Sequence, residues 1–127
     1  MIKKIVATAH APQAIGPYSQ AVEANGFVFV SGQIPLDPKT GYLVPGGIRE
    51  QVKQVMENGK AILTAAGCGM DRVVKTTIYL RNIGDFAAVN EIYGSYFPAE
   101  PPARATVEVS RLPKEAEVEI DFIAVKA

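Results

Sequence analysis

The sequence predicts a two-layer α+β domain in which two helices cover one face of a mixed sheet of about six strands. Several segments are rich in β-branched and aromatic residues, which is typical of strands. Two other segments repeat apolar residues every three or four positions, which is typical of helices that bury one side. The predicted order is β-β-β-α-β-α-β-β. The 127 residues contain no linker or repeat, so we expect one domain over 1–127, since single domains run to roughly 100–200 residues.

The first third of the chain predicts three strands. Residues 2–8 form a short strand, and residues 19–24 and 27–31 flank Asn25-Gly26. This dipeptide is the strongest short signal for a hairpin, because both turn residues accept a positive φ. The second arm of the hairpin is apolar at four consecutive positions, which predicts a strand that is covered on both faces.

The middle of the chain predicts two helices separated by a strand over 72–81. The first helix runs for about five turns and ends at Gly67, a left-handed C-cap. Its apolar stripe consists of Ile48, Val52, Val55, Met56, Gly59, Ile62 and Leu63. Asp85 is the predicted N-cap of the second helix. The apolar residues of that helix are Phe86, Val89, Tyr93 and Phe97.

Two further strands, over 103–109 and 117–125, complete the predicted sheet. If they pair as a hairpin, Arg104 lies close to acidic residues that include Glu119. The right-handed crossover rule places both helices on the same side of the sheet. The opposite face is then bare and partly apolar, which indicates self-association.

Composition excludes several classes of function. Thirteen basic and thirteen acidic side chains give zero net charge, which argues against a nucleic-acid-binding protein, because such proteins carry a basic face. One His and one Cys cannot form a usual four-ligand zinc site or a disulfide within one chain, so we expect no metal centre. The single cysteine fits a reducing compartment, and we expect a cytoplasmic protein. Only 20% of the residues are charged, below the usual value of about 25%, which again favours a surface shared between copies.

A few polar side chains stand at turns or inside apolar strands. Tyr18 directly follows a rigid turn, and Ser31 and Gly32 end an apolar strand where the backbone can approach a ligand closely. Arg104 opens one strand and Glu119 lies inside another. Residue types alone favour ordinary surface ion pairs for the two charged residues and a packing role for Tyr18.

Six separated motifs change that interpretation. They are IGPYSQA at 15–21, FVSGQIPLDPKTG at 29–41, VKTTIYL at 74–80, DFAAVNEIY at 85–93, ARATVEVSRLPK at 103–114 and VEIDFIAV at 118–125. Together and in this order they resemble the reactive-intermediate deaminases of the RidA/YjgF family. The resemblance runs from about residue 8 to the end of the chain.

This resemblance implies a fold similar to chorismate mutase and a homotrimer with three clefts between subunits. It also implies an enzyme that hydrolyses 2-imino acids or their enamine tautomers, such as 2-iminobutanoate and 2-iminopropanoate, to 2-keto acids and ammonia. Pyridoxal-phosphate dehydratases release these imines, so their hydrolysis protects pyridoxal-phosphate enzymes. Neither a metal nor an organic cofactor is implied.

The resemblance also assigns roles to individual residues. It makes Arg104, Glu119 and Tyr18 catalytic, with Arg104 binding the substrate carboxylate and Glu119 positioning a water. The other substrate-binding residues that it implies are Thr106, Ser31, Gly32 and Asn90. Close members of the family often carry Cys two positions after the arginine, where this chain has Thr106. We expect the backbone N–H of Thr106 to donate to the carboxylate all the same.

Two other functions stay open. One is a regulator that binds a keto acid without turnover, although the presence of Arg104 argues against it. The other is the ribonuclease or translation-inhibitor activity attached to this family, which zero net charge opposes.

Overall fold

The computed structural model describes residues 2–126 and consists of one six-stranded sheet with two α-helices. The strands are β1 (Lys4–Val6), β2 (Ala21–Ala24), β3 (Phe27–Gln33), β4 (Val73–Leu80), β5 (Ala103–Glu108) and β6 (Val118–Val125). The helices are α1 (Ile48–Ala65) and α2 (Phe86–Ser95), and short 3-10 turns lie at η1 (Met70–Arg72), η2 (Ile83–Asp85) and η3 (Pro113–Glu115). The predicted fold class and element order are confirmed.

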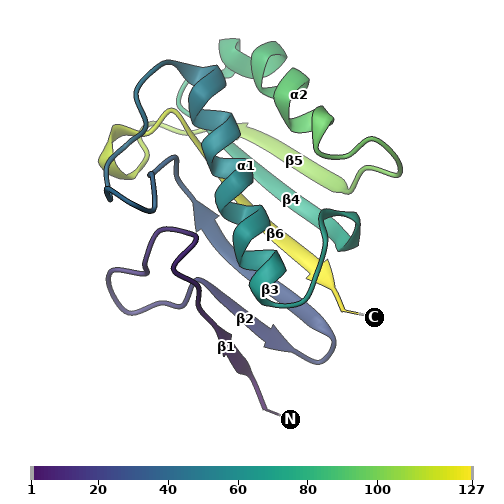
Figure 1. Cartoon of the computed structure of the whole chain (residues 1–127). Coiled ribbons are helices and arrows are strands. Elements are labelled where there is room, and N and C mark those ends of the chain that lie inside the picture. The colour runs from purple at the N-terminus through teal and green to yellow at the C-terminus, as the bar shows by residue number, and fades with distance from the viewer. Residues whose placement is uncertain (1, 127) are drawn as a thin grey trace.

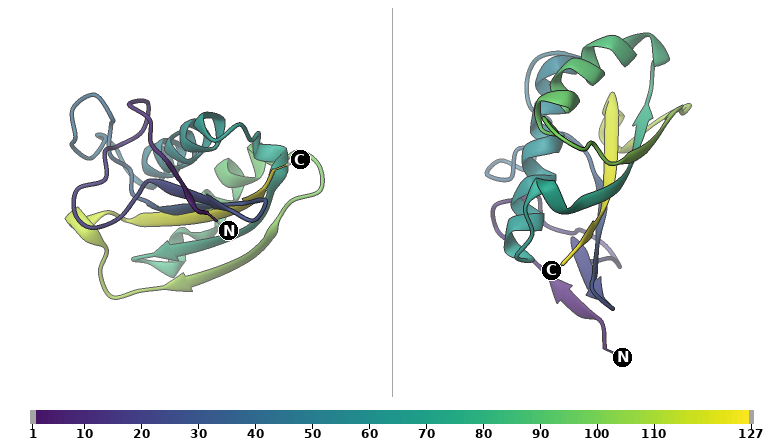
Figure 2. Two further views of the ribbon diagram at one scale, coloured as in Figure 1. Left: turned by 90° about the horizontal axis from the view of Figure 1, so that it is seen from below. Right: turned by 90° about the vertical axis from the view of Figure 1, so that its right-hand side faces the viewer.

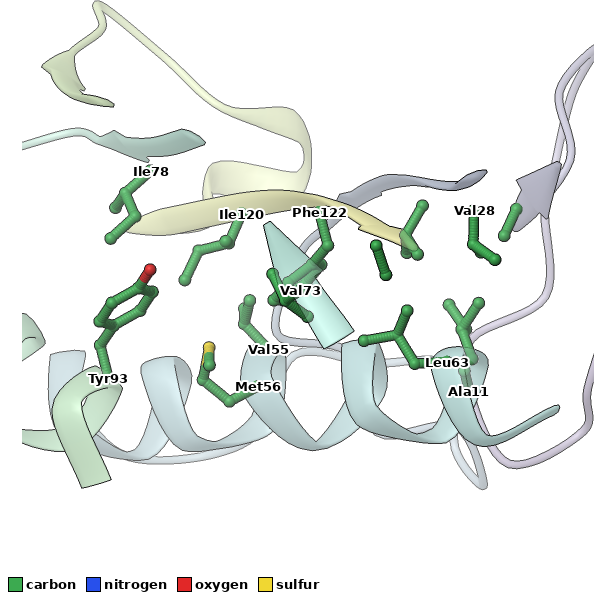
Figure 3. Close-up of a cluster of buried hydrophobic side chains, with 14 of the residues drawn as sticks. Ala11, Val28, Val55, Met56, Leu63, Val73, Ile78, Tyr93, Ile120 and Phe122 are labelled. Atoms are coloured by element: carbon green, nitrogen blue, oxygen red, sulfur yellow. The ribbon is translucent and has the colours of Figure 1, made fainter. Parts of the chain in front are cut away.

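The sheet has the order β1-β2-β3-β6-β4-β5, and only β4 and β5 run parallel. Both helices lie on the same side of it (Figures 1 and 2). The core fills the space between the helices and that face (Figure 3). Within the part of the chain described here, no helix has the length and apolar character needed to span a membrane.

The apolar stripe of α1 packs on the centre of the sheet as its spacing predicts. Val52, Val55, Met56 and Ile62 are fully buried. Gly59 belongs to the same stripe, and a Cβ at this position would lie 2.4 Å from the ring of Phe122 on β6. The missing side chain therefore lets the helix sit directly on the phenylalanine ring. Gly67, with φ +84°, follows the helix in the left-handed conformation that was predicted.

One local prediction is wrong, and a second is confirmed only in part. β5 and β6 do not form a hairpin, because β4 pairs with both of them and separates them. The crossover through α2 places β5 parallel to β4, which leaves the other edge of β4 to β6. Asp85 is the N-cap residue of α2, as predicted, but its side chain makes no capping hydrogen bond. The chain instead enters the helix through η2, where the side chain of Asn82 accepts a hydrogen bond from the Gly84 N–H at 2.8 Å.

The face of the sheet opposite the helices is open in the single chain. Along β6 the residues alternate between buried and half-buried, and the half-buried set, from Glu119 to Val125, points to this face. Phe27 and Phe29 on β3 also lie there, and Phe29 is 45% exposed. The chain therefore covers only one face of β3, although the sequence predicts cover on both.

Three irregular segments gather at one end of the sheet (Figure 1). They are the loop between β1 and β2, the segment after β3, and the turn η3 before β6. These segments meet because β3 ends where its antiparallel neighbour β6 begins. This end of the molecule is where backbone and side chains are free to form a binding site.

We expect Gly59→Ala to lower the free energy of unfolding by about 1–3 kcal/mol, because the new methyl group overpacks the contact with Phe122. Gly94→Ala in α2 is the matched control. It meets nothing within 4 Å and gains up to about 1 kcal/mol from helix propensity. Urea unfolding of both variants measures the difference, and equal stability of the two would contradict the close packing of α1 on β6.

Candidate functional site

A pocket of about 610 Å³ lies at the end of the sheet where the irregular segments meet. Four of the predicted site residues line it, namely Tyr18, Ser31, Gly32 and Glu119. The rest of its wall comes from the loop before β2, the segment after β3 and the turn η3, through Pro12, Gln13, Ile15, Gln20, Gln33, Ile34, Leu36, Pro113 and Lys114. The pocket is thus mainly apolar, with one carboxylate and one ammonium group.

A β-bulge places the Glu119 carboxylate in this pocket. The register of β3 with β6 shifts between Val30 and Gln33, so that Ser31 and Gly32 stand opposite a single residue of β6. The carboxylate of Glu119 lies directly over Gly32, where a Cβ would come 2.1 Å from its Oε2 atom. The absent side chain of Gly32 therefore makes room for the Glu119 carboxylate, whereas its place in the sequence predicts close approach of a ligand to the backbone.

The surroundings of Glu119 favour its protonated form. Burial raises the pKa of this carboxyl above its ordinary value, and the neighbouring charge of Asp121 raises it further. Asp121 lies on the same face of β6 and accepts a weak hydrogen bond from the Tyr79 hydroxyl at 3.4 Å. A carboxyl group with a raised pKa can both accept and release a proton closer to neutral pH, as acid–base catalysis requires.

The hydroxyl groups of Ser31 and Tyr18 are placed differently. The Ser31 hydroxyl donates to the carbonyl of Ser19 at 2.6 Å, so it can offer only a lone pair to a ligand. Tyr18 is 54% exposed at the rim of the pocket. Within residues 2–126 its hydroxyl makes no hydrogen bond, which leaves that group free to donate to a bound molecule.

Arg104 lies in a separate place, at the edge strand β5 beside α2. Its Nη1 donates to the Oδ1 atom of Asn90 at 2.7 Å. The guanidinium stands 5.4 Å from the ring centroid of Phe86 and 5.1 Å from that of Tyr93. These cation–π contacts and the hydrogen bond hold the guanidinium against α2. A guanidinium has five N–H donors, so most of these donors are left to bind a ligand.

Thr106 shares the face of Arg104, two residues along β5. The Val109 N–H donates to the Leu80 carbonyl of β4 at 2.8 Å, and N–H directions alternate along a strand. The N–H of Thr106 therefore points away from β4, to the free edge of the sheet. The hydroxyl of Thr106 is buried, and among the described residues it has no hydrogen-bond partner.

The structure thus divides the predicted site residues into two groups. Tyr18, Ser31, Gly32 and Glu119 line the pocket, whereas Arg104, Asn90 and Thr106 lie at the β5 edge. Arg104 pairs in register with the buried Thr76 on the helix side of the sheet, and Glu119 pairs with Tyr79 on the open side. The two charged groups are therefore on opposite faces of the sheet and do not come together within one chain. The expected hairpin of β5 and β6 would have brought them close to each other.

Several residues of the site were not assigned from the sequence. Gln20 belongs to the IGPYSQA motif, yet only its burial and hydrogen bonds distinguish it from a surface glutamine. Lys114 lines the pocket from η3 with a positive φ of 55°, which no residue-type pattern indicates. Residues 2–126 contain no group of three or more His, Cys, Asp or Glu side chains that could hold a metal ion.

Comparison with known proteins gives a consistent set of relatives. The family model described as Endoribonuclease L-PSP matches residues 8–126. A RutC family protein of Pyrococcus horikoshii is 54% identical, and the match covers 98% of this chain and 99% of that protein. The 2-iminobutanoate/2-iminopropanoate deaminase of Mus musculus is 51% identical, with 99% of this chain and 93% of that protein covered. The crystal structure of E. coli TdcF with bound serine is similar with a TM-score of 0.93 and 43% identity, covering 98% of this chain and 99% of that one.

The raised pKa of Glu119 predicts how its removal changes stability with pH. The folded chain binds this proton more tightly than the unfolded chain, so the ionised carboxylate opposes folding. The loss of folding stability from the ionised carboxylate is absent well below the ordinary pKa of 4.5. It grows as the pH rises from there through the raised pKa of the folded chain. We expect Glu119→Gln to gain stability relative to the parent protein between pH 4 and pH 7. Urea unfolding across this range measures it, and a pH-independent difference would contradict the assigned burial of the carboxylate.

The unpartnered hydroxyl of Thr106 gives a second expectation. Thr106→Val removes a buried polar group that has no partner, so we expect stability to be unchanged or to rise by about 1 kcal/mol. Thr76→Val is the matched control, because its buried hydroxyl bonds to the Tyr93 hydroxyl at 2.6 Å. The control loses about 1–3 kcal/mol. Equal losses in both variants, measured by urea unfolding, would show that the Thr106 hydroxyl is paired in solution.

Proposed function

The chain belongs to the RidA/YjgF family, and from this premise we propose that it is a deaminase that hydrolyses 2-imino acids and their enamine tautomers to 2-keto acids and ammonia. The substrates that we propose are 2-iminobutanoate and 2-iminopropanoate, which the name of the mouse relative contains. Serine bound to the E. coli relative supports a site for a small acid of the same size.

The placement of Arg104 carries the proposal. A guanidinium binds a carboxylate through two parallel hydrogen bonds, which fixes the adjacent carbon of the substrate in space. Asn90 and two aromatic rings orient the Arg104 guanidinium and leave most of its donors unused. The outward N–H of Thr106 lies two residues away on the same edge and is a further donor to the carboxylate.

The reaction needs a positioned water and a group that moves protons. The ionised carboxylate of Glu119 takes a proton from water as the water oxygen bonds to the carbon of the protonated imine, and the C=N π electrons move to nitrogen. Glu119 then returns the proton to that nitrogen, which becomes an ammonium group. The C–N bond breaks, ammonia leaves with the electron pair of that bond, and Glu119 takes the hydroxyl proton as the C=O bond of the keto acid is completed. A protonated imine is already electrophilic, so these steps need only positioning and proton transfer.

We propose that the site is completed between copies of the chain in a homotrimer. Arg104 and Glu119 lie on opposite faces of one sheet, so one substrate reaches both only if they come from different subunits. The open sheet face is apolar at Phe27 and Phe29, which is the kind of surface that a second copy covers. The low charged fraction supports the same assembly.

The biological role that we propose is protection of pyridoxal-phosphate enzymes in the cytoplasm. Imines and enamines released by dehydratases are reactive electrophiles or nucleophiles. Their hydrolysis removes them before they combine with a cofactor or side chain. The role requires no cofactor of the protein's own.

Two other functions lead to different observations. A regulator would bind a 2-keto acid tightly and leave the lifetime of the imine unchanged. An endoribonuclease, which the description of the family model names, would bind RNA with an affinity that falls steeply with added salt. Zero net charge opposes this second function.

The activity is tested by coupling the protein to a threonine dehydratase and trapping the remaining imine with semicarbazide. We expect the protein to shorten the lifetime of the imine. Arg104→Ala lowers kcat/KM at least about 30-fold, since loss of one partner of a charged hydrogen-bonded pair costs about 2 kcal/mol or more. Arg49→Ala, which removes an arginine from an exposed ion pair with Glu91, is the control and keeps activity. An unchanged imine lifetime, or full activity of Arg104→Ala, would overturn the proposal.

A further inference from the structure

One buried glutamine fixes the loop that forms a wall of the pocket. Gln20 is 5% exposed, and its side chain makes four hydrogen bonds to the backbone of residues 8–12. The Thr8 N–H donates to its Oε1 at 2.7 Å. Its Nε2 is 2.7 Å from the Pro12 carbonyl oxygen, 3.1 Å from that of Thr8 and 3.3 Å from that of Ala11.

Little else holds this loop to the sheet. In the described part of the chain, no backbone–backbone hydrogen bond joins residues 8–13 to another element. The side chain of Ala11, which is 1% exposed, also attaches the loop, because it packs into the core (Figure 3). The amide of Gln20 is therefore the main polar connection at the base of the loop.

The backbone of Gln20 is fixed independently of its side chain. Its carbonyl accepts a hydrogen bond from the Ser31 N–H at 2.9 Å, and the Ser31 hydroxyl bonds to the preceding carbonyl. The backbone of Gln20 is thus bonded to the bulged end of β3, and its side chain reaches back to the beginning of the loop. The segment between the beginning of the loop and Gln20 carries Pro12, Gln13 and Tyr18, which all line the pocket.

We propose that Gln20 is a positioning residue, which sets the place of Tyr18 and of one pocket wall by closing the loop over residues 8–20. The activity part of this inference rests on the proposed function, whereas the loop part does not. Gln20→Glu is the informative change. The carboxylate still accepts from the Thr8 N–H, but it has no donor for the three carbonyl oxygens and repels them.

The first test follows the loop without any enzymatic activity. We expect Gln20→Leu to raise amide hydrogen exchange at Thr8 and His10, the two among the described residues 8–13 whose N–H groups are hydrogen-bonded, by about 10-fold or more, while the exchange of α1 and β6 stays as in the parent protein. Gln51→Leu is the matched control, because this similarly buried glutamine bonds to Glu117 and makes no hydrogen bond to the loop in the described part of the chain. Unchanged exchange at Thr8 and His10 in Gln20→Leu would overturn the proposal, whatever the activity of the protein.

The second test asks whether Gln20 acts through Tyr18. Misplacing a catalytic group by about 1 Å costs up to about 100-fold, so we expect Gln20→Glu to lower kcat for imine hydrolysis about 10- to 100-fold. In a Tyr18→Phe background the same change has a much smaller effect, because the hydroxyl that it displaces is already gone. Fully multiplicative effects would contradict positioning of Tyr18. If Gln20→Glu does not fold, Gln20→Leu, which removes all four bonds without a buried charge, is measured in its place.

Inactivity of the parent protein would refute the proposed function but would leave the exchange test intact. In that case pyruvate binding, measured by calorimetry, replaces kcat. We expect weaker binding in Gln20→Glu than in Gln51→Leu, and equal binding in the two variants would overturn the inference.

Discussion

The alternation of side chains along a strand is the constraint on which the site depends. Arg104 on β5 lies in register with Thr76, which faces the helices, whereas Glu119 on β6 lies in register with Tyr79, which faces away from them. No side-chain rotation changes the face from which a residue leaves a sheet. In the proposed reaction, an arginine that binds the carboxylate and a glutamate that transfers a proton reach one substrate from these two positions only across an interface between subunits. On that proposal, association is part of the chemistry rather than an addition to a complete enzyme.

The two groups of residues that we propose to form one site are held by different means. Arg104 rests on regular structure, because α2 supplies both aromatic rings and the amide that orient it. The pocket around Glu119 is built from irregular backbone, and buried amides hold its walls. Gln20 secures the loop before β2, and Asn58 of α1 donates to the carbonyl oxygens of Ile34 and Leu36 after β3. Irregular backbone leaves carbonyl groups without ladder partners, which makes buried amide side chains necessary at this end of the sheet.

Hydrophobic periodicity was sufficient to predict the fold, but not every pairing within it. The stripe of α1 and the alternation of β6 predict their buried faces correctly, since both patterns follow from burial on one side. The insertion of β4 between β5 and β6 could not be predicted from these two strands alone. The apolar pattern of a strand indicates which face is buried, but it does not indicate which strands pair with its two edges. The motifs singled out Tyr18, Gly32 and Glu119, which line one pocket. Gln20 was not assigned a role, because its function depends on carbonyl groups up to twelve residues away that no local pattern reveals.

The central claim is that each site combines Arg104 of one subunit with Glu119 of another. Co-expression of Arg104→Ala with Glu119→Gln chains tests it most directly, with native mass spectrometry to show that mixed oligomers form. We expect each variant alone to keep no more than about one-thirtieth of the parent activity. In randomly mixed trimers about a quarter of the interfaces join an intact arginine to an intact glutamate, so we expect about a quarter of the parent imine-hydrolysing activity. Mixed oligomers without any recovered activity would contradict a site shared between subunits.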